Sequence, residues 1–363
     1  MERRKFLQAT MAAPLVTAMP GAVRDAIAQS GDGWRTYQIV TKVEIANPGG
    51  ISRAWVPLPL TAKSDWHNPM GNKWTGNGQM KVVTDGKYGA EMLYAEWKES
   101  EKAPVVEVTS RFATRDRAVD VSKTSPGAPK LSPAEIKLET ASTIYIPTDG
   151  IVRETARDIT KGANTDVEKA RAIYEWIVDN TFRDPKVKGC GWGDIKSMLE
   201  TRNFGGKCGD LNAMFVGMAR SVGIPARDVY GVRVAPSQFG YKSMGLGSTN
   251  ASKGQHCRAE FFARGIGWVP VDPADVRKVV LEEPPGNLAV NDPKVVAMRK
   301  KLFGAWEMNW LAYNTAHDIK LPHSMTAKIP YLMYTNGETG GKVLDQLDPD
   351  AFKYTITATE IKV

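Results

Sequence analysis

The chain has 363 residues and carries 48 Lys and Arg against 40 Asp and Glu, which gives a formal net charge of +8. This length is sufficient for a large hydrophobic core, arranged as two lobes or as one elaborated domain. The basic residues are scattered, without a stripe or an aromatic nucleic-acid motif, so we exclude nucleic-acid binding as the function.

The first 28 residues predict an export signal. Arg3-Arg4-Lys5-Phe6-Leu7 resembles the twin-arginine motif, a weakly apolar stretch covers 9–23, and Ala26-Ile27-Ala28 provides a cleavage site. Two prolines interrupt the apolar stretch, so the mature chain is expected to keep no membrane span. We therefore expect a periplasmic or secreted protein. Removal of residues 1–28 lowers the charge to +6, which suits contact with anionic envelope polymers or acidic proteins.

Residues 33–120 predict a β-rich lobe, because apolar and polar residues alternate between clusters of turn residues. The expected strands are Tyr37–Ile45, Arg53–Leu58, Met80–Val83, Glu91–Trp97 and Val105–Ala113. They indicate an antiparallel sandwich, which we interpret as a supporting lobe. Residues 121–150 contain a run rich in Pro and Gly at 125–129 and are expected to form a linker.

The segment 205–223 predicts a cysteine at the start of a helix. A glycine-rich turn leads to Cys208, and apolar residues then recur at helical spacing until Gly223 and Pro225. The unpaired N–H groups and the positive dipole end of a helix start favour a thiolate, and Lys207 adds a positive charge. Cys208 is therefore the candidate nucleophile. The alternative is a small buried hydrophobic residue.

A base for this thiol is predicted in the hairpin 255–273. An activated cysteine usually needs an imidazole within hydrogen-bond reach, and His256 begins the first of two strands joined by a turn at Ala263–Gly265. With the hairpin centred on Arg264, His256 is expected to lie opposite Asp272, within about one residue. The carboxylate can then orient the ring. The alternative is a half-buried strand histidine and a turn aspartate that precedes a proline.

Together these segments resemble the bacterial transglutaminase-like family. The matching blocks are Gly206-Lys207-Cys208-Gly209-Asp210, Met218 to Arg227 and Gly267 to Pro273, and the helix expected over 168–180 resembles the helix that precedes them in the family. The resemblance covers about residues 165–278. It implies an α+β fold with a papain-type catalytic core at 151–278, in which a helix carrying the cysteine packs on an antiparallel sheet.

The same resemblance implies a Cys-His-Asp triad, with Cys208 as nucleophile, His256 as general acid and base, and Asp272 as the orienting group. A tetrahedral intermediate also needs hydrogen-bond donors, and the backbone N–H of Cys208 is one. For the second donor the resemblance suggests the indole of Trp192, whose alternative role is packing or lining the pocket. Asn212 and Gln255 are further candidates for an oxyanion or substrate contact.

Two other cysteines remain, Cys190 and Cys257. In an oxidising compartment they could form a disulfide, but Cys257 should point away from the face that carries His256, and two free thiols are the preferred interpretation. No metal is expected, because the acidic residues 345–350 lack the glycine and the distal glutamate of a calcium loop, and the cysteines lack the spacing of a zinc site. No cofactor-binding motif is visible.

Residues 279–363 are expected to form a C-terminal extension. The segment 303–318, dense in aromatic and amide side chains, is interpreted as a wall of the cleft or a structural plug. Residues 352–361 alternate enough to form a closing strand, which we expect to return to the N-terminal sheet.

The sequence therefore predicts an exported cysteine enzyme that attacks an amide of a protein or peptide substrate, forms a thioester and transfers the acyl group to water. One alternative is a transglutaminase that joins glutamine side chains to lysine amines. A second alternative is a non-catalytic scaffold that binds in the cell envelope. The presence of all three residue types of the triad favours an enzyme over the non-catalytic scaffold.

Overall fold

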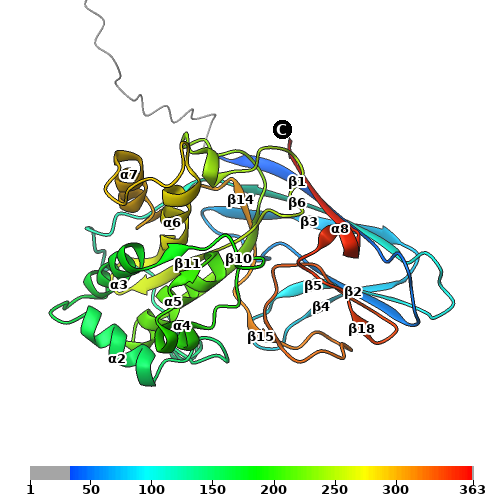
Figure 1. Ribbon diagram of the computed structural model, residues 1–363, viewed down its shortest axis with the longest axis horizontal. Helices are drawn as coiled ribbons and strands as arrows, with labels where there is room; N and C mark the ends of the chain where they lie inside the picture. Colours follow the sequence, from blue (N-terminus) through cyan, green and yellow to red (C-terminus); the bar gives the residue numbers. More distant parts are fainter. Residues whose placement is uncertain (1–32, 362–363) are drawn as a thin grey trace, which may run out of the picture. The chain divides into compact units, whose positions relative to one another are not determined.

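The fold is taken from a computed structural model that describes residues 33–361 (Figure 1). The predicted export signal lies outside these residues. From Trp34 onward the chain forms one compact unit. No helix in this described part combines the length and the apolar character that crossing a bilayer requires.

Two antiparallel sheets form the β-rich lobe. Their strand orders are β19-β1-β6-β3 and β18-β17-β2-β5-β4. The strands are β1 (Arg35–Glu44), β2 (Ser52–Pro57), β3 (His67–Gly76), β4 (Gln79–Thr84), β5 (Glu91–Trp97), β6 (Val105–Thr114), β17 (Asn336–Thr339), β18 (Lys342–Val343) and β19 (Tyr354–Ile361). Buried residues alternate along β1, and the inward side chains of both sheets form one hydrophobic core. This arrangement is the expected sandwich.

The lobe is not built from residues 33–120 alone. The closing strand expected at the end of the chain is β19, which pairs with β1 from Thr36 opposite Ile361 to Val43 opposite Tyr354. A second C-terminal strand, β17, pairs with β2. Strand β3 was not predicted, because its residues are mainly polar and exposed and no apolar alternation marks the strand.

The core that carries Cys208 contains a sheet with the order β12-β11-β10-β14. Its strands are β10 (Ala226–Arg233), β11 (Gln255–Ala263), β12 (Gly267–Val271) and β14 (Trp310–Asn314). Helix α5 (Cys208–Ser221) lies against β10 and β11, and other helices surround it (Figure 1). Residues 208–220 of α5 are all buried, which is typical of a helix that forms the centre of a core.

The helices around α5 complete the core. They are α2 (Gly150–Ile159), α3 (Asp166–Asn180), α4 (Ile195–Thr201), α6 (Pro273–Glu282) and α7 (Pro293–Lys301). Helix α3 covers the range 168–180 where the sequence predicts a helix, and its side chains Ala170, Ile173, Tyr174, Ile177 and Val178 are buried. The remaining short elements are β7 (Arg117–Ala118), α1 (Pro133–Glu139), β8 (Phe182–Arg183), β9 (Gly205–Gly206), the 3₁₀ turn η1 (Lys242–Met244), β13 (Ala305–Trp306), β15 (His317–Ile319), β16 (Ile329–Tyr331) and α8 (Pro349–Phe352). The predicted α+β fold class is thus confirmed.

The boundaries drawn from the sequence cut across structural elements. The segment 121–150, expected as a linker, contains α1, whose buried Glu139 forms ion pairs with Arg220 and Arg227 of the core. Residue 278, the expected end of the core, lies inside α6. Strand β14, from the extension, joins the core sheet beside β10. The C-terminal part of the chain therefore contributes strands to both the β-rich lobe and the core.

Candidate active site

Cys208 is the first residue of α5, as the helical spacing predicts, and Lys207 is the N-cap residue. The backbone around it is fixed by hydrogen bonds. The N–H of Gly209 donates to the carbonyl of Cys190 at 2.7 Å, and a Cβ at Gly209 would lie 2.6 Å from that oxygen. Asp210 accepts from the N–H of Lys207 at 2.9 Å. A glycine after the cysteine is thus required by the close approach of a second chain segment.

The hairpin of β11 and β12 closes one residue later than predicted. Ala263 still pairs with Gly267, so the loop is 264–266 and not Ala263–Gly265. Gly265 in this loop has φ +79°, in the left-handed region that favours glycine. The difference arises because Ala263 continues the ladder on the first strand, which shifts the whole register.

This shift changes the position of Asp272. Val271 pairs with Ala259, so continuing the register by one residue sets Asp272 beside Arg258 and not opposite His256. The predicted direct opposition is wrong by two residues. Asp272 leaves the strand to become the N-cap of α6, where its carboxylate accepts from the N–H of Asp275 at 3.0 Å.

The structure nevertheless brings His256 and Asp272 together. Nε2 of His256 lies 2.8 Å from Oδ2 of Asp272, and both side chains are buried. The backbone on each side is held by a tryptophan indole, since Trp310 donates to the carbonyl of His256 at 2.8 Å and Trp306 donates to that of Val271 at 3.1 Å. The aromatic segment 303–318 is thus a support behind the pair. Because Nε2 faces the carboxylate, Nδ1 is left for a partner in the cleft.

The pKa of the Cys208 thiol and the pKa of the His256 ring are shifted in opposite directions. Hydrogen bonds from Cys190 and Cys257, and then from the ring of His256, hold the pKa of the Cys208 thiol well below its usual range, although burial opposes this. Burial works against the charged form of His256, but the carboxylates of Asp275 and Asp272 raise the pKa of its ring. Both shifts favour a thiolate beside an imidazolium.

Asp275 is a second carboxylate at the ring of His256 and was not among the predicted site residues. Its Oδ2 lies 3.5 Å from Nε2 of His256, and both its oxygens accept from Arg233 at 2.6 and 2.7 Å. Arg258 lies 3.6 Å from Asp272 and over the ring of Trp310. One signal was available in the sequence. Asp275 follows Asp272 by three residues at a helix start, where side chains at this spacing face the same way.

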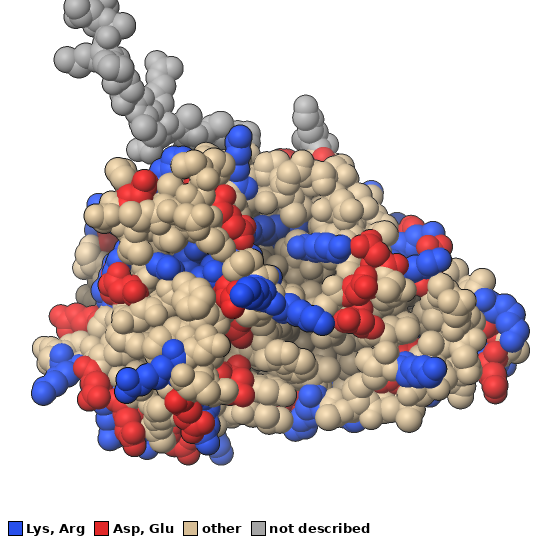
Figure 2. Space-filling model, viewed as in Figure 1, with Lys and Arg blue, Asp and Glu red and all other residues tan. Residues whose placement is uncertain are grey.

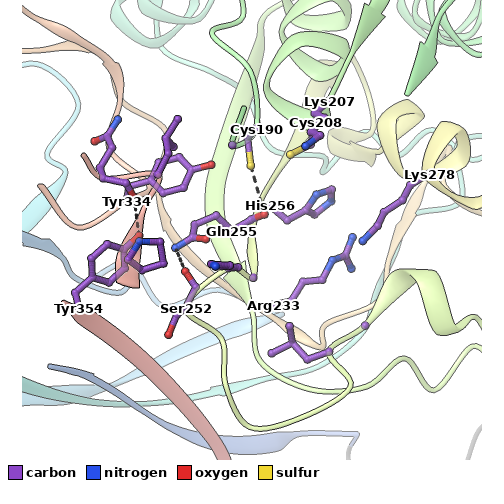
Figure 3. A pocket seen from close by; sticks show the side chains of 18 of the residues that line it. Cys190, Lys207, Cys208, Arg233, Ser252, Gln255, His256, Lys278, Tyr334 and Tyr354 are labelled. Atoms are coloured by element: carbon purple, nitrogen blue, oxygen red, sulfur yellow. Dashed lines mark hydrogen bonds between the residues drawn. The ribbon is translucent and has the colours of Figure 1, made fainter. Parts of the chain in front are cut away.

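The cleft that Cys208 and His256 line has a volume of about 380 Å³. Figure 3 shows both side chains at one side of this space, with Gln255, Ser252, Tyr334 and Tyr354 around the rest. Of the weaker candidates, Gln255 lines the cleft, and its Nε2 donates to the carbonyl of Ser252 at 3.2 Å.

Asn212 and Trp192 do not line this cleft. Asn212 is fully buried, and its amide donates to the carbonyl of Cys257 at 2.9 Å and to Asp272 at 3.3 Å, so it supports the carboxylate from behind. Trp192 is 62% exposed and lies against the ring of Tyr145. The glycines around Trp192 serve a different contact, because a Cβ at Gly191 would overlap the carboxylate of Asp210.

All three cysteines are free and buried, so the disulfide considered for Cys190 and Cys257 is absent. Cys190 donates instead to the carbonyl of Gln255 at 3.4 Å. Cys257 belongs to the same hydrophobic core as Cys208, and it pairs with Tyr230 across the sheet. Both neighbouring thiols therefore remain free beside Cys208 and contribute to its lowered pKa.

Within residues 33–361, one group of side chains has metal-ligand geometry. It consists of His256, Asp272 and Asp275, whose ligand atoms lie within 4.8 Å of one another. Their lone pairs already have partners, since Arg233 occupies both oxygens of Asp275, and the N–H of Asp275 binds Asp272. These side chains are therefore engaged in hydrogen bonds with one another and with Arg233.

Comparisons with known proteins give a family match and a similar fold. The transglutaminase-like superfamily matches residues 153–273, a range that includes Cys208, His256 and Asp272. An uncharacterised protein of Haemophilus influenzae is 37% identical over 342 residues, which are 90% of each chain.

Solved structures are similar at lower identity. A provisionally assigned cysteine protease from Cytophaga hutchinsonii has a TM-score of 0.54 and 11% identity, covering 91% of this chain and 92% of that one, which is a likeness of fold. The periplasmic domain of TgpA from Pseudomonas aeruginosa has a TM-score of 0.32 and 14% identity, covering 65% of this chain and 89% of that one. The match at residues 153–273 shows that the chain contains a transglutaminase-like superfamily domain.

Proposed function

We propose that the protein is a cysteine-dependent hydrolase of protein or peptide amides. One observation carries the proposal: a buried His256, held at 2.8 Å by Asp272, lies at the cleft that Cys208 also lines. A nucleophile, a base and a group that orients the base are the parts required for attack on a carbonyl. The pKa of the Cys208 thiol is lowered, mainly by Cys190 and Cys257 and then by the His256 ring. This lowered pKa supplies the reactive thiolate.

The chemistry follows from the charges of the two groups. The thiolate of Cys208 attacks the amide carbon, and its sulfur–carbon bond forms as the carbonyl π electrons move to oxygen. The protonated ring of His256 gives its proton to the leaving amine, so the carbon–nitrogen bond breaks and a thioester remains. His256 then takes a proton from water, which attacks the thioester and releases the acid and the thiolate.

The first turn of α5 offers a donor to the oxyanion. No backbone carbonyl within residues 33–361 outside α5 accepts the N–H of Cys208, and the first N–H groups of a helix have no partner inside the helix. This N–H is therefore available to the developing negative charge. Gln255, as the one weaker candidate that lines the cleft, is the residue proposed to contact the substrate.

A test uses a set of peptide amides and mass analysis of the products. Cys208→Ala is expected to abolish turnover with little change in thermal stability, and Ser221→Ala, at the other end of α5, is expected to keep it. A thioester trapped on Cys208, followed by a free acid as product, would support hydrolysis. Products joined to an added amine would establish a transglutaminase instead. Unchanged turnover in Cys208→Ala would exclude this residue as the nucleophile.

We also propose that the protein is exported by the twin-arginine route. The proposal rests on Arg3 and Arg4 with the apolar stretch and cleavage site that follow. Replacing both residues with Lys is expected to leave the precursor in the cytoplasm, whereas Arg24→Lys should not. Cell fractionation with an antibody to the mature chain measures the distribution. Normal export of the doubly substituted precursor would contradict this route.

A further inference from the structure

The cleft beside Cys208 is lined by cations and by no acidic residue. Its cationic lining residues are Arg183, Lys207, Arg233, Lys253 and Lys278, and none of its described lining residues is Asp or Glu. Figure 2 shows Lys and Arg side chains around a hollow near the middle of this face of the molecule. A water-filled cleft of one sign of charge raises the local concentration of ligands of the opposite sign.

Two of these cationic residues, Lys278 and Arg233, lie next to His256 in the cleft. Figure 3 shows their cationic ends directed toward one another beside His256. Arg233 has its carboxylate partner, Asp275, at 2.6 Å. Among the described residues, Lys278 forms its ion pair with Glu282 at 3.7 Å, and Glu282 also pairs with Arg183. Burial, together with the charge of Arg233, lowers the pKa of the Lys278 ammonium. An anion in the cleft would relieve this repulsion.

The carboxylates that pair with the five cations do not neutralise them. They are Asp275, Glu282 and Asp350. Asp350 binds Lys253 at the rim, where both side chains are largely exposed. Lys207 directly precedes Cys208, so part of the excess charge lies next to the nucleophile.

We propose that this cleft selects acidic acyl donors, and that Lys278 and Lys207 bind a substrate carboxylate close to the amide that Cys208 attacks. The inference rests on the proposed function, since it names the class of substrate for that site. A charge-assisted hydrogen bond from an ammonium to a carboxylate is stronger than a bond between neutral groups. A neutral donor of the same shape would leave the cations without this partner.

The charge selectivity can be measured without knowing the natural substrate. Iodoacetate and iodoacetamide alkylate the same thiolate and have almost the same size, but only iodoacetate carries a carboxylate. We expect iodoacetate to be the preferred reagent at Cys208 relative to a free thiol peptide, by about tenfold. The ratio of the two rates cancels any change in the pKa of the thiol, so it reports how all the charges at the site, including that of the His256 ring, act on an anion. The lysine variants then separate the contribution of the lysines from that of the ring.

Three variants locate the site. Lys278→Gln is expected to remove most of the preference, and Lys253→Gln, at an exposed position that endangers the fold less, is expected to reduce it. Lys196→Gln on α4, which is exposed and does not line the cleft, should leave the ratio unchanged. A ratio equal to that of the free thiol peptide, or one that Lys278→Gln and Lys253→Gln do not change, would overturn the proposal.

Peptide amides separate this inference from the proposed function. Matched donors that carry Glu or Gln beside the scissile amide are compared by kcat/KM, and the Glu peptide is expected to be favoured in the wild type and not in Lys278→Gln. Turnover without this preference would overturn the acidic substrate class and keep the hydrolase. A strong iodoacetate preference with no amide turned over would overturn the hydrolase and keep the anion site. Failure of Cys208 to react with either reagent would overturn both.

Discussion

Two buried histidines each face an aspartate, but they differ in their contacts, in their access to the cleft and in the direction of their pKa shifts. His256 has Asp272 at 2.8 Å, whereas Nε2 of His317 lies 3.7 Å from Asp228 and makes no hydrogen bond. His256 lines the cleft with Cys208. His317 packs instead between aromatic rings, and its Nδ1 lies 3.2 Å from the hydroxyl of Tyr230.

The electrostatic consequences are opposite. The carboxylates near His256 raise the pKa of its ring despite burial, whereas burial lowers that of His317 well below its usual value. Burial also raises the pKa of Asp228 to about 7. Proximity of a histidine and an aspartate in a core is therefore not sufficient to identify a catalytic pair. A short contact, a second carboxylate and access to the nucleophile are what distinguish His256.

Removing each ring gives the largest expected contrast. His256→Ala should lower kcat by about 100-fold or more, because it removes the group that we propose as the general acid and base. His317→Ala should leave turnover per folded molecule almost unchanged but lower the melting temperature, because a buried side chain is removed. Steady-state kinetics and thermal unfolding of both variants measure the two effects. Equal losses of turnover would contradict the distinction between the two pairs.

A smaller effect is expected at the carboxylates. Asp272→Asn should reduce turnover less than His256→Ala does, because the ring remains and the single amide oxygen of Asn keeps one of the two acceptor contacts of Asp272, either with the His256 ring or with the N–H of Asp275. Asp228→Asn serves as the matched control and should not reduce turnover. Rates for the three variants on one substrate decide the order. A greater loss in Asp272→Asn than in His256→Ala would mean that the charge of Asp272 is needed for more than orientation.

The pH dependence of alkylation sharpens the comparison at Cys208. Because hydrogen bonds from Cys190 and Cys257, and then from His256, lower its pKa, the thiolate persists as the pH falls through the range where ordinary thiols become protonated. Alkylation by iodoacetamide should therefore change little between about pH 8 and pH 6, where a thiol of pKa about 8.5 slows by about tenfold per unit.

The control for this experiment is His256→Ala, in which the midpoint should move to higher pH. His317→Ala should leave the midpoint unchanged. A wild-type midpoint near that of a free cysteine would show that the surroundings of Cys208 do not stabilise the thiolate.

The smallest effect is expected on stability, at Asp228. Its folded pKa of about 7 lies above the value of an unfolded aspartate, so the folded state holds the proton more tightly. The stability that this group contributes is complete below the unfolded pKa of about 4 and is lost as the pH rises to about 7. Asp228→Asn, which cannot ionise, should raise the melting temperature more at pH 8 than at pH 5. A gain that does not grow with pH would contradict the neutral state of this carboxyl.

Much of the site was predictable because its determinants are local. Glycine before and after Cys208, followed by apolar residues at helical spacing, predicts a cysteine in the first turn of α5, and the helix begins there. A His strand, a turn and an Asp before proline predict a hairpin whose two ends meet. The fold class and the family follow from the same blocks, whereas the exact register does not, because either of two adjacent loops satisfies the turn residues.

Only the tertiary structure decided which distant residues complete the site. Arg233 from β10 reaches Asp275 of α6, and Trp306 and Trp310, from the C-terminal extension, hold the backbone of the pair. The cationic cleft likewise gathers residues from 183 to 278 that no sequence spacing relates. The physical reason is the distance along the chain over which each feature is determined. Helix starts and turns are set by neighbours along the chain, whereas strand register, buried charge partners and the field in a cleft are set by packing between segments.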